Sequence, residues 1–482
     1  MPNGFAYLML ALWPLVVMVM FRKMPIERAL IWSILGGYLL LPPSQANLNL
    51  PMIPALDKVS IPNIMALIGC AFIARQRIEP VPHSWLARLL LVILIVAPVA
   101  TVLNNSEAIR FAVQEFQMLE FVSPQGGGIP GLRPYDTFAT VASQVIFLLP
   151  FLLARQFLAT PRALRELLVA LMIGGLVYSL PMLVEVRLSP QLNTWIYGFF
   201  QHSFAQMIRG DGFRPIVFLP HGLWLALFTM MAMFAAMALA RATAPQERTA
   251  LIVATLWLAV MLVLCRSVGP MLIAAGLLPL MLLAPSRVQL GVAALIGLVV
   301  LIYPLLRGSG MFPLETVLQW SEMFGAERAQ SFRFRLENEE ILLARAAEKP
   351  LFGWGTWGRN HVYDPMTGDM LSITDGHWII VIGSFGWTGY LAQFGLLALP
   401  LVMLFLRFPA RPASLAGPVA LLLAANLFDL LPNATLVPLT WLLAGALLGH
   451  AEALRTQDRH NPITGHETMA QPATRRRSRT IL

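Results

Sequence analysis

The sequence contains few charged residues: Asp, Glu, Lys and Arg make up 12 % of its 482 positions, against about 25 % in soluble proteins. Cysteine is almost absent as well, since only Cys70 and Cys265 occur, both inside apolar runs. These shortages exclude a disordered chain, a coiled coil and a disulfide-stabilised secreted domain. We expect both cysteines to be inert thiols, and the sequence has no Cys/His cluster with metal-ligand spacing.

The chain is rich in apolar sequence, because 57 % of its residues are hydrophobic and the mean hydropathy is +0.69. Long apolar runs separated by short polar loops predict an all-α polytopic membrane protein, with about 12–13 transmembrane helices in a single bundle over residues 1–450. The predicted spans are Phe5–Phe21, Ala29–Leu41, Ile61–Ala74, Trp85–Val102, Thr137–Leu153, Leu167–Val184, Ile216–Leu239, Ala250–Cys265, Met271–Leu283, Val288–Leu305, Trp378–Leu406, Ala413–Phe428 and Leu436–Leu448.

The net charge of +9 could indicate a nucleic-acid partner, but the arginines gather in the loops between apolar runs and in the tail. The positive-inside rule explains this distribution better, so we expect a lipid bilayer and no nucleic acid as partner. Every second loop is basic, which places the N-terminus outside and the C-terminus inside. No basic segment precedes the first span, so it does not resemble a signal peptide.

This topology makes four segments long and external: residues 42–60, 103–136, 185–215 and 307–377. The last is the largest and lies late in the chain, where we expect a large periplasmic loop. The polar tail, residues 451–482, ends in a run of arginines, and we expect it to be a disordered cytoplasmic anchor beside anionic lipid.

Arginines outside the membrane break the positive-inside trend. Long loops translocate whatever their charge, and pairing with nearby acids explains Arg307, Arg328 and Arg345. Arg335 could likewise pair with Glu339 at i,i+4 if this segment is helical. The groups that call for another explanation are Arg110, Arg209 with Arg214, and Arg333 with Arg335.

Arg214 and His221 lie at the entrance of an apolar run, in Gly212-Phe-Arg-Pro-Ile-Val-Phe-Leu-Pro-His-Gly222. They lie seven positions apart, so they could share one helix face. A cation and an imidazole at a membrane boundary are costly unless they contact an anion or water. We therefore regard both as candidate substrate-binding residues.

The strongest pattern begins at Ser331-Phe-Arg-Phe-Arg335, continues through an amphipathic stretch, and reaches Pro350-Leu-Phe-Gly353-Trp-Gly355. Asp375-Gly-His377-Trp and a Gly383-Ser-Phe-Gly386-Trp-Thr-Gly389 run follow. This order resembles the O-antigen ligase and polymerase superfamily of membrane glycosyltransferases (Wzy/WaaL-type). The motif covers residues 331–399, and the topology is similar over most of the remainder.

The sequence departs from this family at Trp378, where the family usually has Asn after the His. The alignment therefore leaves open whether His377 or Asp375 holds the role of the base. The run Gly131–Asp136 resembles the exopolysaccharide-polymerase branch, and we favour a polymerase. The glycines of the Pro350–Gly355 run indicate turn geometry more than a phosphate cradle.

The resemblance implies a donor glycan linked to undecaprenyl diphosphate, an acceptor hydroxyl, and a reaction on the periplasmic face of the bacterial inner membrane. Arginine suits a diphosphate leaving group because its guanidinium fork stays charged. The leaving group is already good, so we predict a metal-independent enzyme without cofactor. The catalytic candidates are His377, Asp375 and Arg335, and the substrate-binding candidates are Arg214, Arg333, His221 and Arg110.

Nothing in the sequence specifies the acceptor. A polymerase would use a second lipid-linked repeat unit of O-antigen or exopolysaccharide, whereas an O-antigen ligase would use lipid A core, and a third branch uses protein hydroxyls. A lipid-linked glycan transporter or flippase is the rival of another class. It predicts ionisable residues at mid-membrane and inverted repeats, and the sequence has few of the former and no clear repeat.

Overall fold

The computed structural model describes residues 1–49, 54–111, 128–323, 325–407 and 415–460, with the side chains of 327, 328 and 456–460 excepted. The described part is mostly helical, with two short β-hairpins. The terminal part of the tail, residues 461–482, and the predicted start of a span at Ala413 lie outside the described residues.

Eight helices in the described residues are long and apolar enough to cross a membrane, which identifies a multi-pass membrane protein. They are α1 (Gly4–Lys23), α4 (Trp85–Leu103), α6 (Pro134–Phe157), α7 (Pro161–Leu188), α9 (Gly222–Ala242), α10 (Pro245–Leu264), α12 (Ser286–Gly308) and α15 (His377–Arg407). The other predicted spans correspond to α2 (Ile26–Leu40), α3 (Ser60–Ile68) with the π-helix η1 (Gly69–Ile73), α11 (Val268–Leu283), α16 (Ala416–Asp429) and α17 (Pro438–His460). Each of the thirteen apolar runs therefore forms a helix, although several are shorter than a full span.

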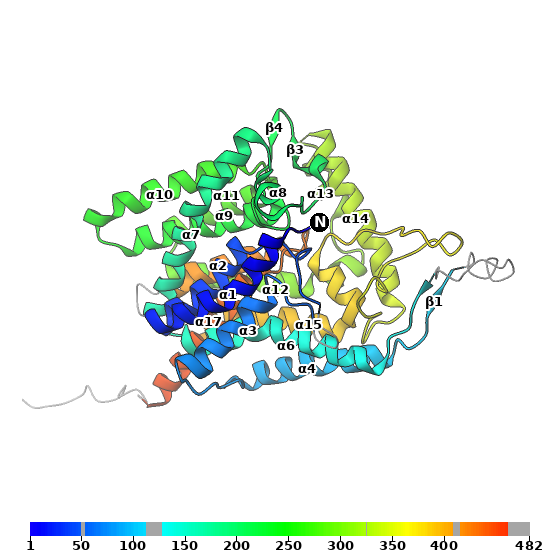
Figure 1. Cartoon of the computed structure of the whole chain (residues 1–482), viewed down its shortest axis with the longest axis horizontal. Coiled ribbons are helices and arrows are strands. Elements are labelled where there is room, and N and C mark those ends of the chain that lie inside the picture. Colours follow the sequence, from blue (N-terminus) through cyan, green and yellow to red (C-terminus); the bar gives the residue numbers. More distant parts are fainter. Residues whose placement is uncertain (50–53, 112–127, 324, 408–414, 461–482) are drawn as a thin grey trace, which may run out of the picture.

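Helix α9 is the most deeply buried of the eight, and it packs against α7, α10 and α11 (Figure 1). Small residues permit close packing, as a Cβ on Gly175 of α7 would lie 2.4 Å from that of Ala232. In the same way, Gly445 and Gly449 of α17 lie against the backbone carbonyls of Phe151 and Arg155 of α6. Cys70 and Cys265 are buried free thiols, as predicted.

Two boundaries differ from the sequence prediction. Helix α9 begins at Gly222 and not near Ile216, because the backbone at Val217 has a φ of 52° and interrupts the helix. Helix α17 continues to His460, beyond the boundary predicted at residue 450. Its extension is held by Glu452, which is buried and lies 3.0 Å from the guanidinium of Arg155.

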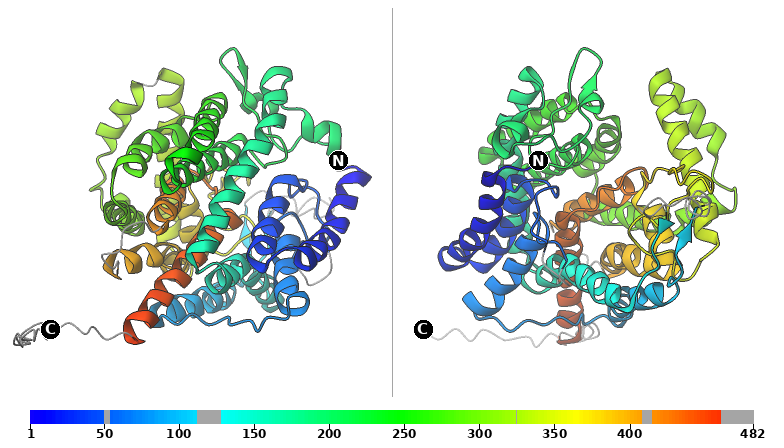
Figure 2. Two further views of the ribbon diagram at one scale, coloured as in Figure 1. Left: turned by 90° about the vertical axis from the view of Figure 1, so that its left-hand side faces the viewer. Right: turned by 45° about the vertical axis from the view of Figure 1, so that its right-hand side comes forward.

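The remaining elements connect the long helices. They are α8 (Leu192–Tyr197), the 3-10 helix η2 (Phe204–Met207), the hairpin of β3 (Ile208–Arg209) and β4 (Gly212–Phe213), the hairpin of β1 (Ile109–Arg110) and β2 (Gly128–Ile129), α13 (Leu314–Glu322) and α14 (Ala326–Ala347). Figure 2 shows α14 standing along one edge of the molecule, apart from the group of α7, α9 and α10. The segment predicted as a large late loop thus contains two helices and an irregular stretch leading to α15.

Candidate functional site

The two glycine-containing motifs of the sequence are paired with each other. Helix α15 is interrupted at Gly386, whose φ of 65° is not helical, and the turn after α14 fills the interruption. Four backbone hydrogen bonds join them, from Trp354 N to Gly383 O (2.8 Å), Gly355 N to Ser384 O (2.9 Å), Trp387 N to Pro350 O (2.8 Å) and Thr388 N to Leu351 O (3.2 Å). The turn therefore supplies the backbone partners that a continuous helix would have supplied.

Glycine is required at both sides of this junction. Gly353 has a φ of 67°, and a Cβ there would lie 2.5 Å from the carbonyl carbon of Ser384. A Cβ on Gly386 would lie 2.4 Å from the backbone of Leu351. The amides of Gly353, Trp354 and Gly355 are all used in backbone hydrogen bonds, so the run is a structural turn and not a phosphate cradle.

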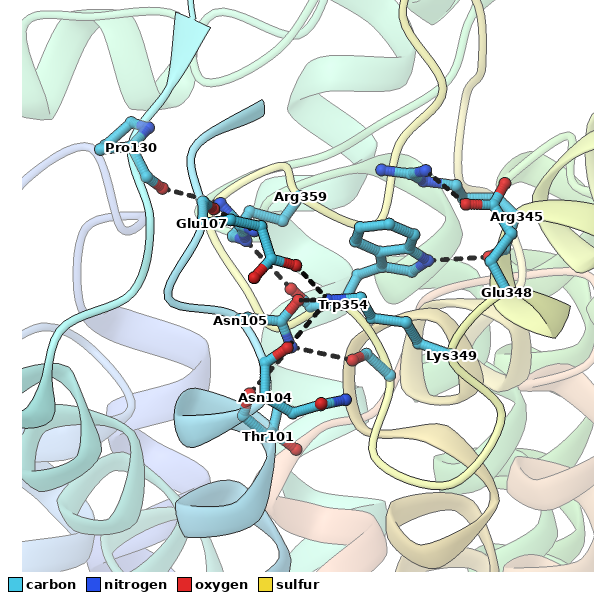
Figure 3. A network of polar contacts seen from close by, with 11 residues as sticks. Thr101, Asn104, Asn105, Glu107, Pro130, Arg345, Glu348, Lys349, Trp354 and Arg359 are labelled. Carbon is cyan, nitrogen blue, oxygen red and sulfur yellow. Dashed lines mark hydrogen bonds and ion pairs between the residues drawn. The ribbon is translucent and has the colours of Figure 1, made fainter. Parts of the chain in front are cut away.

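A polar network ties this turn to the end of α4 (Figure 3). Lys349 Nζ donates to the backbone carbonyl of Asn104 (2.8 Å) and to the side chains of Asn105 (3.0 Å) and Glu107 (2.8 Å). Asn105 in turn donates to the carbonyl of Gly353 at 3.0 Å. The fully buried Arg359 donates to the carbonyls of Trp354, Pro130 and Glu107, and so fixes the loop in one conformation.

A second irregular segment precedes α9, and buried polar side chains satisfy its backbone. Glu185 accepts from the amides of Ile216 and Val217, both at 2.7 Å, and Tyr178 Oη accepts from Phe218 N at 3.1 Å. Three further bonds come from Gln201 Nε2 to Val217 O (2.8 Å), Gln201 Nε2 to Leu219 O (3.1 Å) and Lys58 Nζ to Phe218 O (2.7 Å). Irregular backbone among membrane helices occurs only where such partners exist, and it commonly lines a functional site.

This segment positions Arg214 and His221. Arg214 is buried, and its Nη2 lies 3.3 Å from the backbone carbonyl of Arg266. Its aliphatic stem lies so close to Gly222 that a Cβ there would approach Arg214 Cδ to 2.2 Å. His221 caps α9 by accepting from Leu223 N through Nδ1 at 3.1 Å. The two residues do not share a helix face as expected, because the chain between them is not helical.

Arg335 lies on α14 and reaches the ends of two other helices. Its Nε lies 3.6 Å from Asp375 Oδ2, just before α15, and its Nη1 donates to Asn433 Oδ1 at 3.2 Å and to Pro432 O at 3.3 Å, just after α16. Asn433 is fixed by donating to Asp429 Oδ1 at 2.9 Å. The guanidinium thus joins three segments that are distant in the sequence, and it is about a quarter exposed.

The structure distinguishes the surroundings of Asp375 and His377. Asp375 faces the guanidinium of Arg335, whereas His377 is the first residue of α15 and its Nε2 accepts from the amide of Gln393 at 2.6 Å. The imidazole also packs against Phe394, with ring centroids 5.9 Å apart. The backbone amide of His377 donates to Leu430 O and Asn433 O. These bonds hold in place the turn after α16, which contains Asn433.

The expected Arg335–Glu339 pair is not formed, although α14 is helical over both residues. Glu339 instead lies 3.6 Å from Arg307 Nε and accepts from Tyr303 Oη and Trp378 Nε1. Burial raises the pKa of Glu339 to about 7 against the opposing effect of these partners. As predicted, Arg307 and Arg345 pair with acids, since Arg345 lies 2.8 Å from Glu348; the side chain of Arg328 lies outside the described residues.

The electrostatics connect the two halves of the site. The pKa of His221 is lowered to about 3, chiefly by burial and to a smaller extent by the positive charges of His202, Arg214, Arg209 and Arg335. The imidazole of His221 is therefore neutral at ordinary pH. Burial raises the pKa of Asp375 above its usual value, while the charge of Arg335 opposes that shift. The arrangement is an electropositive region with one carboxylate, able to hold an anion and to accept a proton.

In the part of the chain that the structure describes, the predicted substrate-binding residues Arg110 and Arg333 form no side-chain hydrogen bond or ion pair with the other candidate residues. Arg110 belongs to β1 and lines a cavity beside the C-terminal half of α14, together with Arg345. Arg333 is exposed on α14 and has no ion pair among the described residues. In the Gly131–Asp136 run, Gly131 packs closely against the backbone carbonyl of Ser106. The run ends at the start of α6, where Asp136 Oδ2 accepts from Arg133 N at 2.7 Å.

Sequence reasoning missed several residues of this site. Glu185 sits late in an apolar run and Asn433 in a short turn, and neither has a motif around it. Arg266 also has no motif around it, but its carbonyl accepts from Arg214 and its guanidinium donates to the carbonyl of Arg209. Glu185 could have been recognised from the sequence, because it is a charged residue at the end of a long apolar run, and such residues are commonly functional.

No protein-family model matches this sequence, and no curated protein matches it significantly. The geometry of the described residues therefore carries the functional argument.

Proposed function

We propose that this chain is a membrane glycosyltransferase that polymerises oligosaccharide repeat units linked to undecaprenyl diphosphate. The observations that carry the proposal are two polar groups at the ends of apolar helices, the buried Arg214 with His221 before α9, and Arg335 with Asp375 before α15. A lipid diphosphate holds its charge at the membrane boundary, where such guanidinium groups can contact it. The basic loops on the opposite side support a site that faces the periplasm.

The reaction follows from these groups. The hydroxyl oxygen of the acceptor attacks the anomeric carbon of the donor, and the bond from that carbon to the diphosphate oxygen breaks. Its electron pair leaves with the diphosphate, whose growing charge Arg214 and Arg335 stabilise. The hydroxyl proton passes to Asp375, whose pKa burial raises above the usual aspartate value, which makes its carboxylate a stronger base. No step requires a metal.

His377 serves this scheme as a positioning residue. Its imidazole is engaged by Gln393, and its backbone amide holds the Leu430–Asn433 turn against Arg335. Polymerase and O-antigen ligase share the donor chemistry described above and differ only in the acceptor, a second repeat unit or lipid A core. We favour the polymerase on the sequence resemblance alone.

A lipid-linked glycan transporter is the alternative that one structural feature favours. Transporters commonly have interrupted helices around a substrate site, and here both α15 and the entrance to α9 are interrupted. Against it, the interruption at Gly386 is closed by four backbone hydrogen bonds from the Pro350 turn, so its polar groups are already occupied.

The test is reconstitution of the full chain in liposomes with a lipid-diphosphate repeat unit, in EDTA. Polymerisation predicts longer lipid-linked glycans and free undecaprenyl diphosphate, both lost in Arg335→Ala. Transfer to added lipid A core without elongation would replace the polymerase by a ligase. Movement of the donor across the bilayer without any new glycosidic bond would replace the enzyme by a transporter, and activity restored only by magnesium or manganese would contradict metal independence.

A further inference from the structure

A cavity of about 460 Å³ lies apart from the site described above, between β1, the C-terminal half of α14 and the segment His361–Pro365. Its polar lining includes Arg110, Arg345, Glu348 and His361, and its aromatic lining includes Phe111 and Tyr363. A volume of this size is within the range of about 300–1,000 Å³ found for small-ligand sites.

We propose that this cavity binds an acidic sugar residue of the glycan, at a distance from the reacting end. The inference rests on the proposed function, because it names the class of glycan that the same protein extends. Arg345 and Arg335 lie on one helix, ten residues apart, so the cavity and the catalytic arginine are separated by about 15 Å along α14. A glycan of several sugars can occupy both places at once.

The charge balance of the cavity favours an anionic ligand. Of its two guanidinium groups, Arg345 is neutralised by Glu348 at 2.8 Å and stacks 3.3 Å above the Trp354 ring. Arg110 has no ion pair among the described residues, and it enters from a different element, β1. One cation thus remains for a carboxylate, and a guanidinium binds a carboxylate through two parallel hydrogen bonds.

The remaining groups suit the rest of a sugar ring. Tyr363 and Phe111 pack together with centroids 5.5 Å apart, and Tyr363 Oη donates to Gly358 O, so these rings are fixed apolar surfaces for sugar C–H groups. His361 Nδ1 lies 3.2 Å from the carbonyl of Ser372 and 3.3 Å from its hydroxyl. Nε2 accepts if Nδ1 carries the proton and donates if it does not, and a sugar hydroxyl can serve as its partner in both cases.

The cavity wall formed by α14 and the turn that follows it is held in place by hydrogen bonds. Trp354 Nε1 donates to the carbonyl of Arg345 at 2.8 Å, and the network of Lys349 and Arg359 fixes the adjoining turn (Figure 3). Preorganisation of this kind lowers the entropic cost of binding. The cavity therefore has the properties of a binding site for a glycan segment, with Arg110 selecting for negative charge.

The test measures binding of a fluorescent oligogalacturonate to the detergent-solubilised full chain, with a neutral maltooligosaccharide of matched length as comparison. We expect the acidic glycan to bind more tightly, and Arg110→Ala to weaken it about tenfold, the loss of one charge-assisted contact. Arg187→Ala, an exposed arginine at the end of α7, is the matched control and should bind like the wild type. Equal binding of both glycans, or unchanged binding in Arg110→Ala, would overturn the site.

Inorganic phosphate separates a glycan site from a general anion site. Competition by phosphate as effective as that by unlabelled oligogalacturonate would also overturn the proposal. In the liposome reaction with an acidic repeat unit, Arg110→Ala should shorten the product chains. If binding depends on Arg110 but the protein elongates no glycan, the polymerase proposal is refuted and the cavity proposal is supported. If the protein elongates glycans but Arg110→Ala leaves the chain lengths unaltered, the cavity proposal is refuted and the polymerase proposal is supported.

Discussion

The carboxylate of Glu185 accepts the backbone amide of Val217 at 2.7 Å, across 32 positions of sequence, and accepts the amide of Ile216 through the same oxygen. Val217 has a φ of 52°, a conformation that a β-branched residue rarely adopts. The carboxylate thus stabilises the irregular backbone that leads from Arg214 to His221. Glu185 takes no part in the proposed reaction, but it determines where the guanidinium of Arg214 lies.

Replacement of this carboxylate is the first test. Glu185→Gln keeps the shape but turns an N–H₂ group towards backbone donors, and we expect a loss of about 1–3 kcal/mol in stability. Turnover per folded molecule should also fall, because Arg214 loses its support. The measurement is thermal unfolding in detergent together with the liposome assay. Glu247→Gln, at an exposed acid in the first turn of α10, should change neither quantity.

The second test concerns the two arginines of the proposed diphosphate site. Arg335→Ala and Arg214→Ala should each lower the rate about a hundredfold, or about 3 kcal/mol, by analogy with the loss of one oxyanion donor. Lysine should not rescue either position well, since it keeps the charge and loses the planar fork. Folded yield and turnover are measured in the same preparation, with Arg187→Ala as control. Normal turnover per folded molecule would remove that arginine from the site.

The pH dependence tests Asp375. A general base works only when ionised, so activity should rise as the pH increases through the pKa of Asp375, which burial raises above the usual aspartate value. Asp375→Asn should lose about 10²- to 10⁴-fold in rate and should also lose this acidic limb. A variant that keeps the limb would show that another group titrates.

The junction between the turn and α15 can be tested with glycine substitutions. Gly353→Ala and Gly386→Ala place a Cβ within 2.6 Å of backbone atoms at positive φ, and each should destabilise the fold by about 1–3 kcal/mol. Gly276→Ala is the control, because the space around this helical glycine in α11 is open and alanine favours a helix. Equal melting temperatures for Gly386→Ala and Gly276→Ala would contradict the close packing of the Pro350–Gly355 turn against α15.

The predicted topology is tested by cysteine labelling after replacement of Cys70 and Cys265. A cysteine at the exposed Met366, before α15, should react with an impermeant reagent from the periplasmic side. A cysteine at the exposed Gln246, in the first turn of α10, should react only after the membrane is opened. The reverse pattern would place the arginine site on the cytoplasmic face, where the proposed donor has no access to it.

Apolar run length was sufficient to predict where helices form, because burial of backbone in lipid leaves few alternatives to a helix. Run length alone did not predict the break at Val217, although Pro215 and Pro220 flank that residue and proline disfavours a helix interior. The partner that stabilises the irregular backbone, Glu185, lies on another helix and could not be read from the local sequence. For the same reason Arg335 was recognised, but its partners were not. Asn433 and Asp375 reach it through tertiary packing, while the nearer Glu339 turns towards Arg307.

The pairing of the Pro350 turn with α15 has a consequence for biosynthesis. Until the turn docks, α15 carries unsatisfied carbonyls at Gly383 and Ser384 and unsatisfied amides at Trp387 and Thr388, which is costly in hydrocarbon. The turn is synthesised before the helix, so it can be present when α15 enters the bilayer. Insertion of α15 is then a joint event of the helix and its preceding loop, and a chain in which the loop is delayed would leave α15 poorly inserted.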